Sequence, residues 1–553
     1  MSYRAKLLNY FYQRDRGLVI SLLAAVCLVY LPFLGNLLLF DDLRFFSGTV
    51  SHYIKSPFDF NLRWFPYASL AWTWEYFSDV PHIHRLFNML LHVICVLLLF
   101  FWLRQITMLV APAIKASDTK ISYSSWGAWL GALFFACHPL AVYAVGYMIQ
   151  RSTLMATLFT LAMQLVYVQG LVCEQKLGQK LWLALSALFY FFAVFSKEHS
   201  LMAPAIVLVT TILLRPHIRA DSRALWITWL GYAIIGLVVV LSIKGIFGIA
   251  YEIDAADLFE QQGIAASAES LRLLSILTQA GLYFKYLFLW LLPNPAWMSI
   301  DMREAFASSL NAWQNWLGGI GFILYGLLAF RLLLRRGKLG LAGLALLYPW
   351  LFFMVEFSTV RVQEPFVLYR SYLWLPGMML LFPLLLDALP NRKSTIVALT
   401  VITLSLVPLS WNRLWVFSDP YRLWNDAALL LPDEHTPGAA RIYYNRGSAE
   451  LATKRWNEAI ADYRRVISIN PKIAQVYNNI GVAYSGLGRY QEAISEFDQA
   501  IALRPNYAEA YYGKGMALKR LHSNEEALVY IKKGCELGNN MACIIMAFQK
   551  QSK

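Results

Sequence analysis

Long apolar stretches constrain this chain more than any other feature, because most of them are long enough to cross a lipid bilayer. A spanning helix needs about 20 predominantly apolar residues. The stretches of roughly this length are 18–40, 86–103, 124–142, 152–172, 180–195, 200–214, 225–248, 271–292, 312–334, 339–357, 372–389 and 394–411. Those at 180–195 and 200–214 are short for a span. The sequence therefore predicts an all-α, polytopic membrane domain over residues 1–411.

The composition agrees with burial in lipid and changes the meaning of the positive charge. Only 15% of the 553 residues are charged, whereas soluble domains carry about 25%. A net charge of +14 would suit nucleic acid, but Lys and Arg in short loops between spans are cytoplasmic topology signals. These clusters are the N-terminal arm, Arg104/Lys115/Lys120, Lys176/Lys180, Arg215/Arg219/Arg223, Arg331/Arg335/Arg336/Lys338 and Arg392/Lys393. We therefore expect no nucleic-acid partner.

The basic clusters also limit the number of spans. The last two clusters lie on the cytoplasmic side only if one of the apolar stretches before them does not cross. The best candidate is 271–292, which carries Arg272, Gln279 and Lys285, so we expect a re-entrant or in-plane helix there. About eleven spans remain, the N-terminus is cytoplasmic, and everything after Trp411 lies on the far side of the membrane.

This topology gathers polar residues on the far side, where the main loops are 41–85 and 249–311. Two adjacent carboxylates, Asp41 and Asp42, follow the first span and are costly to keep at a membrane boundary for packing alone. A solvated helix cap would also account for them. The far-side set is Asp41, Asp42, Arg44, Glu75, His82, His84, Arg85, His138, Gln150, Arg151, Lys197, Glu198, Asp301, Glu364 and Arg370. A lipid-borne substrate in the far leaflet would meet these side chains.

A 34-residue period marks residues 412–553. It appears in Tyr443/Tyr477/Tyr511, Gly447/Gly481/Gly515, Ala459/Ala493/Ala527 and Ile460/Ile494/Leu528. This period is typical of the tetratricopeptide repeat (TPR), with two antiparallel helices per repeat. The expected repeats are 440–473, 474–507 and 508–541, after a half-repeat from Tyr421 to Pro432 and before a closing helix from Met541 to Phe548. Such α-solenoids present extended concave binding surfaces, so we expect a protein partner.

The six cysteines predict neither a metal site nor a redox motif, because none has Zn-ligand or CxxC spacing. Four of them lie in or beside apolar stretches: Cys27, Cys95, Cys137 and Cys173. Cys535 and Cys543 are able to pair in an oxidising compartment. Two small buried apolar residues are the other interpretation.

The far-side residues also stand in motifs that resemble a known family. The run from Phe40 to Phe46, with Asp41-Asp42, resembles the Asp-Asp/Asp-Glu motif of integral-membrane GT-C glycosyltransferases. Further motifs look like signatures of the transmembrane-and-TPR O-mannosyltransferase family and its bacterial relatives, including pilin glycosyltransferases: His138-Pro139-Leu140, Ala144-Val145, Gln150-Arg151-Ser152, Phe195-Ser196-Lys197-Glu198 and the run from Tyr369 to Gly377. Relatives often carry Glu or His beside the late arginine, whereas Leu368-Tyr369 precede Arg370 here, so mannose is not assumed.

The resemblance implies a membrane glycosyltransferase of EC class 2.4 that inverts the anomeric carbon. It would move a monosaccharide from a polyprenyl-phosphate donor to a Ser or Thr hydroxyl. By motif position, Asp41 is expected to take the hydroxyl proton, and Asp42 to orient Asp41 or share its proton. The candidates for holding the donor phosphate are Arg151, Lys197, Arg370 and His138. Further substrate-binding candidates are Arg44, His84, Gln150, Glu198, Asp301 and Tyr372.

Each of these residues has an ordinary structural alternative. Arg151 suits a snorkelling role at the interface, Lys197-Glu198 an ion pair in a turn, and His138-Pro139 the end of a helix. We expect no cofactor and no metal ion, although the paired aspartates are able to hold a divalent cation.

The expected protein is therefore a bacterial inner-membrane enzyme whose periplasmic TPR domain engages an exported acceptor protein. A pilin is a candidate acceptor, and mannose and arabinofuranose are candidate sugars. Two other functions stay open. A flippase or transporter of lipid-linked sugars would place charges at mid-membrane depth and show internal repeats. A non-enzymatic TPR scaffold would need no reactive far-side cluster.

Overall fold

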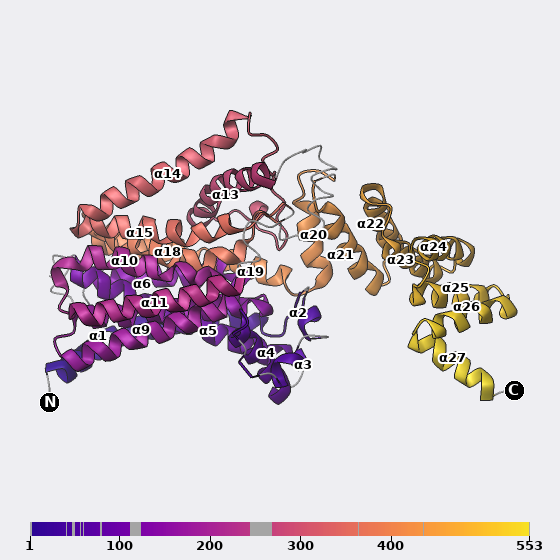
Figure 1. Ribbon diagram of the computed structural model, residues 1–553, viewed down its shortest axis with the longest axis horizontal. Helices are drawn as coiled ribbons and strands as arrows, with labels where there is room; N and C mark the ends of the chain where they lie inside the picture. The colour runs from indigo at the N-terminus through magenta and orange to yellow at the C-terminus, as the bar shows by residue number, and fades with distance from the viewer. Residues whose placement is uncertain are drawn as a thin grey trace. The chain divides into compact units, whose positions relative to one another are not determined.

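All regular secondary structure in the computed structural model is helical (Figure 1), as the apolar stretches predicted. The structure describes residues 3–39, 41–46, 50–55, 57–58, 60–77, 80–110, 123–243, 268–362, 364–434 and 436–551. Two compact units are present. The first unit contains Met1–Met298 and Glu304–Asp419, and the second contains Ser299–Arg303 and Pro420–Lys553.

The first unit is a bundle of long apolar helices that run side by side (Figure 1). Within the described residues, ten segments are long and apolar enough to cross a membrane, or up to twelve if two bent pairs each count as one span. The helices are α1 (Tyr3–Tyr30), α5 (Pro81–Val110), α6 (Tyr123–Cys137), α8 (Arg151–Val172), α9 (Lys176–Ser196), α10 (Ala203–Leu214), α11 (Ser222–Ile243), α13 (Ala268–Leu291), α14 (Trp313–Leu334), α15 (Gly337–Phe353), α17 (Leu381–Ala388), α18 (Arg392–Leu404) and α19 (Val407–Val416).

Short helices connect these long ones. They are α2 (Asp41–Arg44), α3 (Val50–Lys55), α4 (Trp64–Phe77), α7 (Val142–Val145) and α16 (Ser371–Trp374). Three of them, α2, α7 and α16, carry motif residues. Single 3₁₀ turns lie between them, notably η4 (Pro139–Ala141), η5 (Met148–Gln150), η6 (Glu198–Met202), η9 (Met354–Ser358), η10 (Leu368–Arg370) and η11 (Pro376–Leu380).

Two of the expected spans are broken by proline. The pair Tyr123–Cys137 and Pro139–Val145 bends by 53°, and the pair Leu368–Trp374 and Pro376–Ala388 bends by 51°. Proline begins the second half of each, since it has no N–H to continue the preceding helix and its ring clashes with that helix. His138 caps the first break, because its Nδ1 accepts the Leu140 N–H at 3.2 Å. These breaks fold motif residues back into the interior.

The stretch expected as a re-entrant or in-plane helix forms the 24-residue helix α13. Its segment Ser270–Leu291 is long and apolar enough to cross a membrane. Two of the three polar residues that argued against a span have partners inside the protein: Gln279 donates to the Pro365 carbonyl at 2.8 Å, and Lys285 pairs with Glu304. The third, Arg272, is exposed. These residues therefore do not exclude a span by themselves.

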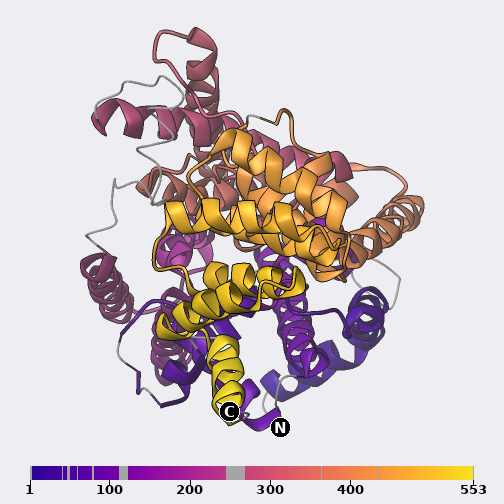
Figure 2. The ribbon, with the colours of Figure 1, turned by 90° about the vertical axis from the view of Figure 1, so that its right-hand side faces the viewer.

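The second unit stacks its helices in sequence order, as Figure 2 shows in orange to yellow. After α20 (Pro420–Leu429) come three helix pairs and a final helix. The pairs follow the expected repeats: α21 (Ala439–Ala452) with α22 (Trp456–Ile469), α23 (Ala474–Gly486) with α24 (Tyr490–Leu503), and α25 (Ala508–Arg520) with α26 (Asn524–Glu536), before α27 (Asn540–Gln551).

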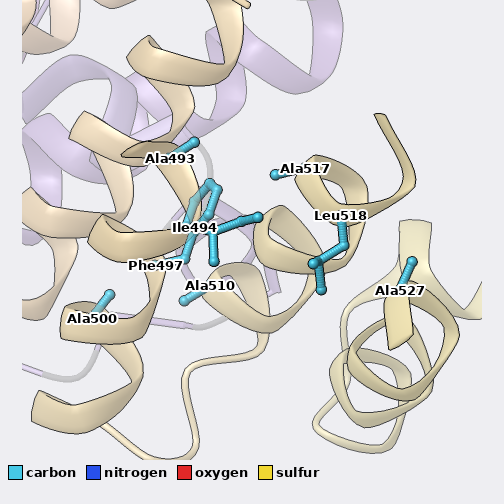
Figure 3. Packing of buried hydrophobic residues seen from close by; sticks show 8 residues of the cluster. All are labelled: Ala493, Ile494, Phe497, Ala500, Ala510, Ala517, Leu518 and Ala527. Carbon is cyan, nitrogen blue, oxygen red and sulfur yellow. The ribbon is translucent and has the colours of Figure 1, made fainter. Parts of the chain in front are cut away.

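The periodic glycines explain how closely these helices approach. A Cβ on Gly481 would lie 2.8 Å from the Phe497 ring, and one on Gly515 would lie 2.7 Å from Ile531. Figure 3 shows the core around Phe497, in which alanines of α24, α25 and α26 leave room for the larger side chains. Glycine therefore recurs every 34 residues because a larger side chain at these positions would collide with the neighbouring helix.

Cys535 and Cys543 form a disulfide between α26 and α27. They are thus covalently paired, and not merely two small apolar side chains. Among the described cysteines, Cys27, Cys95, Cys137 and Cys173 are free thiols.

The packing around Phe497 yields a stability prediction. Phe497→Ala removes a ring that is 1% exposed and should lower the free energy of opening of α24 and α25 by about 3–5 kcal/mol. Hydrogen exchange of full-length protein in detergent, read on peptides from these helices, checks this. Val529→Ala is the matched control, because Val529 is 65% exposed. Equal protection in the two variants would contradict the packing described.

Candidate functional site

Asp42 is the buried member of the aspartate pair and is 1% exposed. Its Oδ1 accepts the Ile149 N–H at 2.8 Å, and its Oδ2 accepts the Leu39 N–H at 3.4 Å. Burial raises the pKa of Asp42 to about 6, while the positive charge of Arg85 and the backbone N–H donors oppose that rise. Asp42 therefore joins the loop that follows α1 to the turn that contains Ile149.

Arg85, at the start of α5, strengthens the same junction. Its Nε donates to the Asn36 carbonyl at 2.9 Å, and its Nη groups donate to the carbonyls of Leu37 and Gly146. One buried guanidinium thus joins the loop before Asp41 to the segment that follows α7.

Asp41 is partly exposed and has a different neighbour. Its Oδ2 accepts the Tyr147 O–H at 2.8 Å, and its N–H donates to the Tyr147 hydroxyl oxygen at 3.2 Å. Burial raises the pKa of Tyr147 well above its ordinary value, and the nearby Asp41 and Asp42 carboxylates raise it further. Tyr147 is therefore a neutral donor to Asp41. Of the two carboxylates, Asp41 is the one that a substrate reaches more easily.

Lys197 lies between α9 and η6 and is almost fully buried. Its Nζ donates to Thr153 Oγ1 at 2.6 Å and to Gln150 Oε1 at 3.2 Å, and it lies 4.7 Å from the centroid of the Tyr369 ring. Burial lowers the pKa of Lys197 to about 7, and the positive charge of Arg63 contributes. An anion bound beside Lys197 would favour its charged, ammonium form.

Next to Lys197 runs a chain of ionisable side chains of alternating type. Arg63 Nε donates to Glu198 Oε2 at 3.0 Å, and Glu198 Oε1 lies 3.5 Å from His199 Nδ1. His199 Nε2 lies 2.7 Å from Glu356 Oε1, whose other oxygen accepts from Arg370 Nη1 at 2.6 Å. The Glu198 carboxylate holds the pKa of Arg63 well above its ordinary value. Glu198 thus pairs with Arg63, while the Lys197 ammonium is directed to Gln150 and Thr153.

Aromatic rings join the aspartate to these cations. The Tyr147 ring lies 6.4 Å from that of Tyr369, centroid to centroid, and Tyr369 lies beside Lys197. We use the name polar cluster for the resulting set: Asp41, Arg63, Tyr147, Gln150, Thr153, Lys197, Glu198, His199, Glu356, Tyr369 and Arg370. Five of the predicted site residues belong to it: Asp41, Gln150, Lys197, Glu198 and Arg370.

Arg151 is buried beside an open pocket, and its hydrogen-bond partners lie outside the polar cluster. Its guanidinium donates to Asn88 Oδ1 at 2.9 Å, to Thr73 Oγ1 at 3.2 Å and to the His84 carbonyl at 3.1 Å. The ring of His84 also contacts Thr73, with Nδ1 3.1 Å from Oγ1. Arg151 forms part of the wall of an open pocket of about 410 Å³, lined otherwise by Ser69, Trp72, Thr73, Tyr76, Phe77, Phe87, Leu91 and Met155.

His138 and Tyr372 lie in a buried aromatic layer. The His138 ring stacks on Trp290, with 4.4 Å between centroids, and the Tyr372 hydroxyl lies 2.6 Å from His92 Nδ1. Phe135 packs against both Trp290 and Tyr372. In the described structure these residues make packing and capping contacts.

The last two predicted residues lie elsewhere. Asp301 belongs to the second unit, where its carboxylate pairs at 2.7 Å with Arg303 and at 2.6 Å with Arg441. The side chain of Arg44, like residues 244–267 of the expected long loop, lies outside the described part of the chain.

The sequence reasoning missed Arg63, Tyr147, His199 and Glu356. Glu356 had a usable signal, because it is a lone carboxylate near the end of the apolar stretch 339–357, and ionisable residues within spans are usually functional. Within the described ranges, no three His, Cys, Asp or Glu side chains are placed to hold one metal ion.

Comparison with known proteins identifies the C-terminal region. The tetratricopeptide repeat family matches residues 438–506 and 478–540. The chain is also similar to the TPR domain of Arabidopsis OM64, with 24% identity over 21% of this chain and 97% of that chain and a TM-score of 0.20. It is similar to MamA, with 30% identity over 21% and 64% of the two chains and a TM-score of 0.19. No curated protein matches the chain. The 34-residue period is therefore confirmed as a set of tetratricopeptide repeats.

The raised pKa of Asp42 predicts pH-dependent stability. Folding moves this pKa from 3.8 to about 6, so between these values the folded protein holds a proton that the unfolded chain has lost. Asp42 therefore favours the folded state more at pH 5 than at pH 7.5. We expect Asp42→Asn to reduce the excess of the thermal midpoint at pH 5 over that at pH 7.5, measured by tryptophan fluorescence in detergent. Asp221→Asn, at an exposed carboxylate, should show the wild-type difference in thermal midpoint between the two pH values. If Asp42→Asn also shows the wild-type difference, Asp42 is not the group responsible.

Proposed function

We propose that the protein is a membrane glycosyltransferase that moves a monosaccharide from a polyprenyl-phosphate donor to a Ser or Thr hydroxyl of an exported protein. One observation carries this proposal. A partly exposed carboxylate, Asp41, belongs to the same cluster as the buried cations Lys197 and Arg370, through Tyr147 and Tyr369. A general base near phosphate-binding cations is what sugar transfer from a phosphate requires.

The reaction assigns a role to each end of the cluster. Asp41 takes the proton of the acceptor hydroxyl as the hydroxyl oxygen attacks the anomeric carbon. The bond from that carbon to the phosphate oxygen breaks, and the polyprenyl phosphate leaves with the electron pair. Attack opposite the leaving group inverts the anomeric carbon. Lys197 and Arg370 stabilise the charge that develops on the phosphate.

The surroundings of Lys197 support its role at the phosphate. Its ammonium already has oxygen acceptors in Thr153 and Gln150, which hold its position before a donor arrives. Because burial lowers the pKa of Lys197 to about 7, an incoming phosphate would gain a partner whose charge it also stabilises. Arg370 is oriented by its bond to Glu356.

A lipid-borne donor agrees with the pocket beside Arg151. Aromatic and aliphatic side chains of α4, α5 and α8 provide most of its wall, and Trp72, Tyr76 and Phe77 are strongly exposed. Such a surface on a membrane protein suits a hydrocarbon chain. The resemblance names polyprenyl phosphate as the carrier, and mannose and arabinofuranose remain the candidate sugars.

The TPR domain would engage the acceptor protein, for which a pilin is one candidate. The disulfide between Cys535 and Cys543 supports an oxidising compartment, since structural disulfides are rare where thiols are kept reduced. A bacterial inner-membrane protein with a periplasmic TPR domain meets this condition.

The enzyme assignment predicts that Asp41→Asn abolishes transfer. Loss of a general base lowers rates by about 10²–10⁴-fold, while an isosteric amide should leave folding and membrane insertion intact. The added sugar is detected by intact-mass measurement of exported proteins from cells that carry the wild-type protein, Asp41→Asn or the control Asp221→Asn, and from cells that lack the gene. Asp221→Asn should retain modification. Full modification by Asp41→Asn would reject Asp41 as the general base. Full modification in cells that lack the gene would reject the enzyme and favour a TPR scaffold, and lipid-linked sugar that changes leaflet without protein modification would favour a flippase.

The topology predicts that the TPR domain is accessible from the periplasm. Protease added to spheroplasts should remove residues after Asp419 and leave the turn around Glu174 uncut until the membrane is permeabilised. Fragments are identified by mass spectrometry. If the TPR repeats are digested only after permeabilisation, both the topology and the acceptor model are wrong.

A further inference from the structure

The hydroxyl of Tyr147 is bonded twice to one residue. It donates to Asp41 Oδ2 at 2.8 Å and accepts the Asp41 N–H at 3.2 Å. Tyr147 is 2% exposed and lies between α7 and η5. One rigid phenol therefore restrains both the backbone and the carboxylate of Asp41, which stands at the start of the four-residue helix α2.

The ring of Tyr147 is held by neighbours that do not need its hydroxyl. It packs against Phe417 and Tyr369, each with 6.4 Å between ring centroids. Among the described residues, the two aspartates and Tyr369 are ionisable groups that act on Tyr147. Removing the hydroxyl alone would therefore preserve the aromatic packing and delete the two bonds to Asp41.

We propose that Tyr147 is a positioning residue for the Asp41 carboxylate, which it holds in a fixed orientation and in its ionised form. This inference rests on the proposed function, in which Asp41 is the general base. A hydrogen bond donated to a carboxylate stabilises the charged form, and a base acts only in the form that lacks the proton. Tyr147 would thus set both the direction and the availability of the base.

The arrangement also connects the two halves of the reaction. Tyr147 touches Tyr369, and the Lys197 ammonium lies over the Tyr369 ring at 4.7 Å. Because Tyr147 orients Asp41 and also contacts Tyr369, it fixes the base relative to the Lys197 ammonium proposed to bind the phosphate. Positioning of this kind affects the chemical step more than donor binding.

The test replaces Tyr147 by Phe and follows protonation of Asp41 without using activity. A hydrophobic carbodiimide reacts with protonated carboxylic acids, and peptide mass spectrometry measures labelling of Asp41 in the purified full chain at each pH. In Tyr147→Phe the midpoint of labelling should move up by about one pH unit, the size expected for one hydrogen bond to a charged group. Tyr143→Phe is the matched control, because Tyr143 is also buried and packs on Phe417.

Kinetics provide the second readout. With the polyprenyl-phosphate sugar and acceptor peptide as substrates, Tyr147→Phe should lower kcat about tenfold, leave KM for the donor unchanged and move the acid limb of the pH–rate profile upward. Tyr143→Phe should match the wild type. A labelling midpoint in Tyr147→Phe equal to that of the wild type would overturn the inference.

The two proposals fail in different ways. If labelling shifts in Tyr147→Phe but Asp41→Asn still transfers sugar, Tyr147 orients Asp41 and Asp41 is not the general base. If no variant, the wild type included, transfers sugar while labelling shifts, Tyr147 orients Asp41 and the proposed function is wrong. If Asp41→Asn is inactive and labelling does not shift, the function stands and the positioning role is rejected. Should Tyr147→Phe be poorly folded, a double-mutant cycle of thermal midpoints with Asp41→Ala, which removes the acceptor, decides: an equal loss in the wild-type and Asp41→Ala backgrounds rejects the side-chain bond.

Discussion

Charge neutralisation inside an apolar unit is the constraint on which the polar cluster depends. Burying an ionised side chain without a partner is very costly. Each carboxylate here has a cationic partner: Glu198 pairs with Arg63 and Glu356 pairs with Arg370, with the His199 ring between the two carboxylates. The five residues come from the loop before α4 and from the 3₁₀ turns η6, η9 and η10. Their pairing joins segments that lie far apart in the sequence, and the position of Lys197 follows from it.

The two aspartates show how neighbouring residues acquire different tasks. Successive side chains at the start of a helix point about 100° apart, so Asp41 and Asp42 cannot share one environment. Asp42 turns inward to backbone donors, while Asp41 meets Tyr147 and stays partly exposed. Of two adjacent carboxylates, one therefore holds the loop and the other remains partly exposed.

Periodicity and motif position predicted the long apolar helices, the repeats and the grouping of Asp41 with Lys197 and Arg370. They could not give the direction of individual side chains. The His138 ring stacks on Trp290 and Arg151 forms part of a pocket wall, because hydropathy does not show which face of a loop turns inward. Glu356 was missed for a different reason: a single charge barely alters an apolar average, although a lone carboxylate in such a stretch is itself a signal.

The disulfide between α26 and α27 has a consequence for how the solenoid is completed. Repeat arrays are held by contacts between neighbours, so their ends open most easily. Closing a loop of this short length stabilises a fold by about 2–3 kcal/mol in the chain-entropy picture. A chain still in a reducing compartment would have a loosely closed last repeat, and oxidation would finish it. The redox state of Cys535 and Cys543 thus indicates whether the C-terminal repeats have reached an oxidising compartment.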